Sequence, residues 1–176
     1  ASRGIGSATA IAFAKSGVTR IGLHFFSNRS GAEQTGDAVR NHGAEPVVLE
    51  ADLGTSEGIA ALRGRIETSL PGIDLLVNNA GHLVGRAKLL DCTEDFYDRV
   101  MTLNTKSVWF VSQTVVPHML QKGGGAVVNV SSIAAVMGIG TSVAYAASKG
   151  ALNTMTLSLA RALGPQIRIN AVCPGF

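Results

Sequence analysis

Hydrophobic residues along the chain alternate between short apolar runs and longer stretches that mix apolar and polar positions. A run such as residues 46–51, Pro-Val-Val-Leu-Glu-Ala, is typical of a buried strand. A stretch such as residues 30–42, which is polar and is followed by Gly43, is typical of a helix that ends at a glycine. Short apolar strands that alternate with helices indicate a parallel sheet covered by helices on both faces.

The same patterns set the expected bounds of the elements. Strands are predicted over residues 21–26, 46–51, 73–77, 126–130 and 167–172. Helices are predicted over residues 6–17, 30–42, 56–70, 95–121 (interrupted near 103–107) and 143–163. Right-handed crossovers between such strands build a doubly wound α/β sheet.

No linker or internal repeat divides this pattern, so we expect residues 1–176 to form one domain. Gly4-Ile5-Gly6 opens the first helix, and in dinucleotide-binding (Rossmann) folds such a turn follows a strand. No strand precedes it here, and the chain stops just after the strand at 167–172. We therefore expect a dinucleotide-binding catalytic domain that lacks its first strand and its C-terminal segment, with a gap in the sheet.

The composition is that of a globular chain with a mildly basic surface. Hydrophobic residues make up 46% and charged residues 15%, with a formal charge of +3. Lysines and arginines are scattered singly, so no nucleic-acid partner is expected. There is no signal peptide and no apolar run long enough to span a bilayer, so we expect a cytoplasmic protein without a membrane partner. Cys92 and Cys173 lack CxxC spacing and the four histidines lack ligand spacing, so no metal is expected.

Tyr145 and Lys149 stand four positions apart within the helix expected over residues 143–163. On a helix this spacing places both side chains on one face, one turn apart. A free phenol has a pKa of about 10 and is a poor base at neutral pH. A nearby ammonium favours the phenolate and lowers that pKa, so the pair suits an acid–base tyrosine. Alone, the spacing also fits an amphipathic helix with a buried ring and a solvated lysine.

Further motifs accompany this pair in order along the chain. These are Gly4-Ile5-Gly6, Asn78-Asn79-Ala80-Gly81 after one strand, Ser131-Ser132 after another, and Pro174-Gly175 near the end. With them the chain resembles the short-chain dehydrogenase/reductase family over essentially its whole length, in particular its 3-oxoacyl-ACP-reductase-like, NADP-dependent members. The family begins with Thr-Gly-x-x-x-Gly-x-Gly, and residues 1–6 match the last six of those positions.

The resemblance implies which residues would hold a nicotinamide dinucleotide. Glycines let the backbone approach the pyrophosphate, which the N-terminus of the following helix attracts. Asp52 would accept a hydrogen bond from the adenine, with Leu53 beside the ring, although a strand-end cap is the structural alternative. Asn78 would mainly tie neighbouring strands together. The implied cofactor-binding residues are Ser2, Arg3, Gly4, Ile5, Gly6, Asp52, Leu53, Asn79, Ala80, Gly81, Tyr145, Lys149, Pro174 and Gly175.

It also implies a catalytic set. Tyr145 would be the general acid/base, and Lys149 would lower the phenol pKa and hold the nicotinamide ribose. Ser132, thirteen positions before Tyr145, would polarise the substrate carbonyl, while Ser131 would hydrogen-bond locally. Asn104 would interrupt its helix and hold a water in a proton relay to the lysine.

Charge favours NADP over NAD as the cofactor. Family members that use NAD place an acid at the end of the second strand, here the position of Phe25, and no acid occurs over residues 21–31. A missing carboxylate removes repulsion against a 2′-phosphate, which Arg3 is placed to bind. Further donors come from Ser27, Asn28 and Arg29.

These features predict reversible hydride transfer between NADP(H) and a small-molecule carbonyl or alcohol. The first alternative is an NAD-dependent alcohol or polyol dehydrogenase, and one of another class is a non-catalytic dinucleotide-binding or truncated relative. A β-ketoacyl thioester, a sugar, a steroid and a quinone remain open as substrates. The loop after Gly81 suggests only an apolar wall, made by Leu83, Val84, Leu89 and Leu90.

Two helical segments, residues 106–120 and 151–163, are apolar on more than one side. Such a helix needs a second surface against which to bury its apolar residues. Because the family buries these helices between subunits, we expect a homodimer or homotetramer. Deeper burial within one subunit is the alternative.

Overall fold

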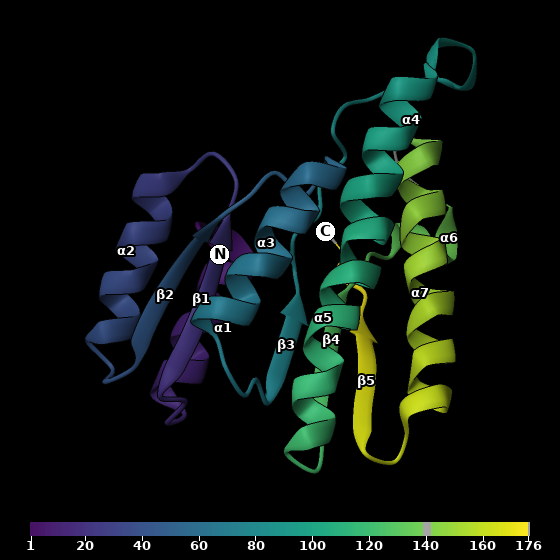
Figure 1. Ribbon diagram of the computed structural model, residues 1–176. Coiled ribbons are helices and arrows are strands. Elements are labelled where there is room, and N and C mark those ends of the chain that lie inside the picture. The colour runs from purple at the N-terminus through teal and green to yellow at the C-terminus, as the bar shows by residue number, and fades with distance from the viewer. Residues whose placement is uncertain (139–141, 176) are drawn as a thin grey trace. The chain divides into compact units, whose positions relative to one another are not determined.

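The computed structural model describes residues 1–138 and 142–175, and the chain within it divides into two compact units. The first unit holds residues 1–53 and 57–71, and the second holds residues 54–56 and 72–176. Each unit has parallel strands and helices (Figure 1), so the predicted α/β class is confirmed. That the whole chain forms one domain stays a prediction.

The first unit contains a two-stranded parallel sheet of β1 (Arg20–Phe25) and β2 (Glu45–Glu50), with Phe25 opposite Glu50. Alternate residues of β1 are buried, as the pleat of a half-covered strand requires. Its helices are α1 (Gly4–Lys15), α2 (Arg29–Arg40) and α3 (Ser56–Ser69). The buried core cluster beneath them consists of Ala10, Ala14, Ile21, Leu23, Val39 and Ala44.

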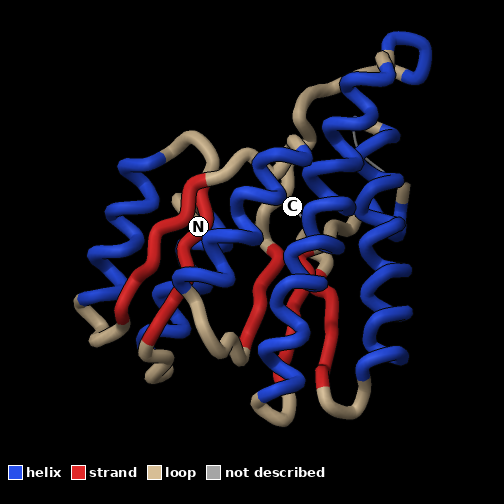
Figure 2. The backbone as a smooth tube through the Cα atoms, in the orientation of Figure 1, coloured by secondary structure: helices blue, strands red, loops and turns tan. Residues whose placement is uncertain are grey.

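The second unit contains a three-stranded parallel sheet in the order β3 (Leu75–Asn78), β4 (Gly125–Val130), β5 (Ile167–Val172), drawn red in Figure 2. Among the described residues no strand pairing joins this sheet to β1 and β2. The helical elements of this unit are η1 (Leu89–Asp91), α4 (Glu94–Met101), η2 (Thr102–Lys106), α5 (Ser107–Gln121), α6 (Ala134–Met137) and α7 (Val143–Leu163).

A row of buried polar side chains crosses the second unit beneath the ends of its strands. Asn78 donates to the Oδ1 of Asn129 at 2.9 Å and to the Oγ of Ser112 at 3.2 Å. Asn129 in turn donates to the Oγ1 of Thr156 at 2.8 Å. The row joins β3, β4, α5 and α7, so Asn78 ties elements of the fold together, as the resemblance implied.

Candidate active site

Tyr145 and Lys149 lie on the first two turns of α7. Ser142 is the N-cap of the helix, and its Oγ accepts a 3.4 Å hydrogen bond from the backbone N–H of Tyr145. This cap satisfies one of the N–H groups left free at a helix start. The Nζ of Lys149 lies 5.9 Å from the centroid of the Tyr145 ring. The helical spacing therefore brings an ammonium beside a half-buried phenol.

Lys149 is buried, with 3% of its surface exposed, and its Nζ donates a 2.8 Å hydrogen bond to the carbonyl of Val130. Burial lowers the pKa of Lys149 to about 8, partly opposed by its electrostatic interaction with Cys173. A pKa of about 8 still leaves most of the lysine protonated at neutral pH. Because Lys149 is buried, the alternative interpretation, in which this lysine is solvated, is excluded.

Asn104 lies at the centre of a π-helical turn, η2, that separates α4 from α5. The sequence predicted this interruption, and such turns often mark functional positions. The side chain is fully buried and its Oδ1 accepts from the backbone N–H of His82 at 3.1 Å. Its Nδ2 donates to the carbonyls of His82 at 3.0 Å and of Val100 at 2.9 Å. Asn104 thus holds the backbone just after β3 in one position.

The side chains of Asn104 and Lys149 both approach the backbone at Gly81. A Cβ atom at this position would lie 2.8 Å from the Oδ1 of Asn104 and 2.9 Å from the Nζ of Lys149. Both distances are too short for a real Cβ, so the backbone passes here only because the residue is a glycine. Asn79 and Ala80, the preceding residues of the motif, are half-buried.

The two serines after β4 make different contacts. Ser132 is half-buried, and its Oγ accepts from the backbone N–H of Ala134 at 3.2 Å. Ser131 was expected to hydrogen-bond locally, which is wrong. Its Oγ is buried and donates to the carbonyl of Lys149 at 3.3 Å, across to α7.

Pro174 lies beside the loop that carries these serines. Its carbonyl accepts a 3.0 Å hydrogen bond from the backbone N–H of Ile133. The following residue, Gly175, is exposed. Within the second unit, Asn104, Gly81 and Lys149 form one cluster, with Tyr145 beside it and Ser132 on a loop tied to Pro174.

The glycine-rich turn in the first unit starts α1. Gly4 has a left-handed φ of 55°, and the side chain of Arg3, at the N-cap, makes no capping hydrogen bond. N–H groups at such a helix start suit an anion such as a pyrophosphate. Arg3 and Ile5 are exposed, Gly6 is buried, and the carbonyl of Ser2 accepts from Asn28 at 3.4 Å.

Asp52 and Leu53 follow β2 in the same unit. Asp52 is half-buried, whereas Leu53 is 5% exposed and belongs to the core. Phe25, at the position where NAD-using members place an acid, is buried at 3% exposure. Asn28, expected to offer donors to a ligand, caps α2 with its Oδ1, which accepts from the N–H of Gly31 at 3.1 Å, while its Nδ2 donates to Ser2.

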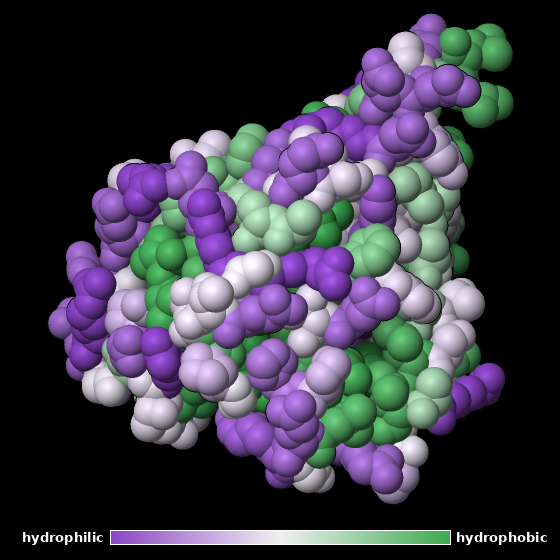
Figure 3. Space-filling view, in the orientation of Figure 1, coloured by the Kyte–Doolittle hydropathy of each residue, from purple (hydrophilic) through white to green (hydrophobic). Residues whose placement is uncertain are grey.

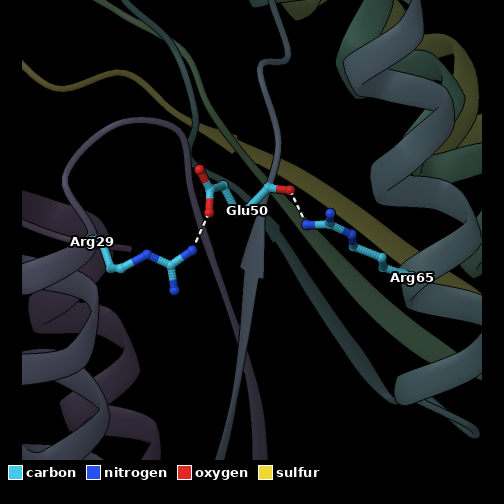
Figure 4. Close-up of polar contacts among 3 residues, drawn as sticks. All are labelled: Arg29, Glu50 and Arg65. Carbon is cyan, nitrogen blue, oxygen red and sulfur yellow. Dashed lines mark hydrogen bonds and ion pairs between the residues drawn. The ribbon is translucent and has the colours of Figure 1, made fainter.

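Sequence reasoning missed Glu50. It lies opposite Phe25 in the parallel register and forms an ion pair with Arg29, which also lies over the Phe25 ring at 5.3 Å. Figure 4 shows Glu50 between Arg29 and Arg65, whose guanidinium donates to the Glu50 carbonyl oxygen. The only sequence signal was an acid at the end of a predicted strand.

A family model described as short chain dehydrogenase matches residues 1–176. The chain belongs to the short-chain dehydrogenase family. Versicolorin reductase stcU of Emericella nidulans is 32% identical over 176 residues, which are 99% of this chain and 66% of that protein. The chain thus spans about two thirds of that relative's length.

Two solved structures are similar over 99% of this chain. Acetoin dehydrogenase from Enterobacter cloacae is 33% identical, with a TM-score of 0.91 and 69% of its own chain covered. The NADH-dependent reductase A1-R′, solved with NAD, is 34% identical, with a TM-score of 0.90 and 75% covered. These similarities extend the family assignment to the fold.

This short-chain dehydrogenase has neither a candidate membrane-spanning helix nor a candidate metal-binding cluster in the part that the structure describes. None of its described helices has the length and hydrophobicity needed to span a bilayer. Within residues 1–138 and 142–175 no group of three His, Cys, Asp or Glu residues is arranged to hold a metal ion.

The apolar wall expected after Gly81 is uneven in exposure. Leu83 and Val84 are half-buried, while Leu89 and Leu90 on η1 are 78% and 95% exposed. Figure 3 shows hydrophobic atoms at this projecting end of the molecule. Leu89 also lines a pocket of about 570 Å³ with Cys92, Tyr97 and neighbouring residues. None of the predicted catalytic residues lines that pocket.

Proposed function

We propose that this chain is an oxidoreductase that transfers a hydride between NADP(H) and a carbonyl or alcohol group. The observation that carries the proposal is a buried, protonated lysine beside a half-buried phenol on one helix. Lys149 has a pKa of about 8 and its Nζ lies 5.9 Å from the Tyr145 ring. A positive charge held there favours the phenolate, as an acid–base tyrosine needs.

In the direction of reduction, each residue of the site has a separate role. When bound, the nicotinamide cofactor supplies the hydride. Tyr145 gives its proton to the carbonyl oxygen as that oxygen gains negative charge. Ser132 donates a hydrogen bond to the same oxygen. Lys149 keeps the phenol acidic, and Asn104 fixes the turn beside it and supports the relay that returns the proton.

The first unit, taken by itself, holds groups that fit the phosphates of a dinucleotide. The start of α1 offers N–H groups for phosphate, and the exposed Arg3 offers a guanidinium for a 2′-phosphate. This supports NADP as the cofactor. Glu50, which lies opposite Phe25, favours NAD as the second candidate, as does the NADH-dependent similar structure.

The proposal also covers the substrate and the oligomeric state, of which it names only the general class. The similar proteins named above are a versicolorin reductase and an acetoin dehydrogenase, which differ widely in substrate. We therefore propose a small-molecule carbonyl or alcohol without choosing among the open classes.

Trp109 on α5 is 48% exposed and Leu157 on α7 is 53% exposed, which supports a homodimer or homotetramer through these helices.

The proposal is tested with Tyr145→Phe, with Tyr97→Phe as the matched control because Tyr97 is exposed on α4. NADPH and NADH consumption is followed against a panel of ketones, aldehydes and β-ketoacyl thioesters. We expect Tyr145→Phe to lower kcat about 10³-fold, the typical contribution of a general acid, while cofactor binding changes less than twofold. Activity within tenfold of the unsubstituted protein would refute the assignment of Tyr145.

A further inference from the structure

An exposed ion pair closes the carboxyl end of the two-stranded sheet in the first unit. Arg29 is the first residue of α2, and Glu50 is the last residue of β2 (Figure 4). Their side chains are 62% and 47% exposed, and the pair is in direct contact. In open parallel sheets, ligands bind beyond the carboxyl ends of the strands.

Both partners of the pair are held by neighbours. The guanidinium of Arg29 lies 5.3 Å from the centroid of the Phe25 ring, a cation–π contact that limits where it can move. The backbone carbonyl of Glu50 accepts a hydrogen bond from Arg65 on α3. Figure 4 shows the Glu50 carboxylate facing Arg29 and its backbone carbonyl facing Arg65.

The start of α2 packs against the glycine-rich turn. Asn28 donates to the carbonyl of Ser2 at 3.4 Å, and a Cβ at Gly31 would lie 2.4 Å from the same oxygen. Arg29 therefore stands on the turn of α2 that touches the residue before Arg3. This places the ion pair on the part of the unit where the phosphate end of a dinucleotide would bind.

We propose that Glu50 sets the cofactor preference of this protein by competing with a ribose 2′-phosphate for Arg29. The inference rests on the proposed dinucleotide-dependent function. An ion pair this exposed is weak in water, and a phosphate carries more charge and more acceptor oxygens than a carboxylate. NADP binding exchanges the partner of Arg29, whereas NAD binding, which brings a hydroxyl, leaves the pair intact.

The sequence could not give this result, because residues 21–31 contain no acid. The parallel register supplies one from the neighbouring strand, directly opposite Phe25. The chain therefore carries a cation, Arg29, that binds the 2′-phosphate, and an anion, Glu50, that competes with this phosphate and weakens the preference for NADP.

The test compares dissociation constants for NADPH and NADH, measured by fluorescence titration on the intact protein. The variants are Glu50→Gln, Arg29→Gln and the double variant. The opposite end of the same two strands offers a matched control, since Arg20 and Glu45, which are register partners, also form an exposed ion pair at 3.4 Å. Glu45→Gln removes the same charge from the same strand.

We expect Glu50→Gln to tighten NADPH binding at least fivefold and to change NADH binding less than twofold. Arg29→Gln should weaken NADPH binding at least tenfold, and adding Glu50→Gln to it should then change NADPH binding less than twofold. Glu45→Gln should leave the ratio of the two constants unchanged, and the effect of Glu50→Gln should shrink at high salt.

An unchanged ratio in Glu50→Gln, or weaker NADPH binding in that variant, would overturn the inference while leaving the proposed function intact. If neither dinucleotide binds the unsubstituted protein, the proposed function itself fails. Circular dichroism of each variant separates a binding effect from loss of folding.

Discussion

The ammonium of Lys149 donates a 2.8 Å hydrogen bond to the carbonyl of Val130, the last residue of β4. This contact replaces water around the charged Nζ, because only 3% of the surface of Lys149 is exposed. The pKa of about 8 shows that the replacement is incomplete, because burial still disfavours the charged form. The site therefore keeps a positive charge at a cost to the folded state.

That cost predicts how the stability of the protein depends on pH. The pKa of Lys149 falls from 10.5 in the unfolded chain to about 8 in the folded one. Between these pH values the unfolded chain binds a proton that the folded chain does not, so stability rises with pH. Lys149→Met lacks this contribution. From pH 7 to pH 11 the difference in unfolding free energy should move by about 3 kcal/mol in favour of the unsubstituted protein.

Urea denaturation of both proteins at a series of pH values measures this difference. Other titrating groups are common to the two proteins and cancel. A difference that stays flat across this range would mean that the lysine is not buried as described.

Gly81→Ala should disturb the catalytic cluster directly. The added Cβ would lie within 3.0 Å of both the Asn104 and the Lys149 side chains, so at least one must move. Small displacements of catalytic groups cost up to about 10²-fold in rate, and we expect kcat to fall at least tenfold. Gly64→Ala on α3 is the control, because nothing lies within 4 Å of its added Cβ. Equal activities of the two variants would contradict the arrangement around Gly81.

Thr156→Val tests the buried polar row of the second unit. Thr156 is 6% exposed and accepts the hydrogen bond of Asn129, which the valine cannot do. An unsatisfied buried amide hydrogen should lower the unfolding free energy by about 1–3 kcal/mol, measured by chemical denaturation. Thr154→Val, an exposed position on the same helix, should change it by less than about 0.5 kcal/mol.

Trp109→Glu tests the proposed assembly. If α5 and α7 pack between subunits, a carboxylate at this exposed position would be buried without a partner and should dissociate the oligomer. Sedimentation velocity would then show monomers. Leu90→Glu, on η1, adds the same charge outside these helices and should leave the assembly unchanged. A protein that is monomeric before any substitution would refute the proposal.

The sequence predicted the repeating elements better than the contacts between them. Periodicity found each of the five strands in the described part of the chain, and β5 appeared with its predicted bounds, residues 167–172. The π-helical turn at Thr102–Lys106 also fell where the interruption was expected. Two short elements, η1 and α6, were missed because three or four residues carry no period.

Within the candidate site, helical spacing was enough to pair Tyr145 with Lys149. The contact of Ser131 with the carbonyl of Lys149 and the ion pair of Glu50 were missed for a common reason. Each joins residues that are distant in sequence, and only the packing of α7 or the register of β1 with β2 brings them together. A pattern within one segment of the sequence does not predict contacts of this kind.

Asn78 and Asn129 are also exact register partners, which gives their hydrogen bond a second consequence. If β4 slid along β3 by a single residue, the side chain of Asn129 would turn to the opposite side of the sheet. Both amides would then be stranded in an apolar interior. The pair therefore favours the aligned register, because a slipped strand would leave both amides without their partner.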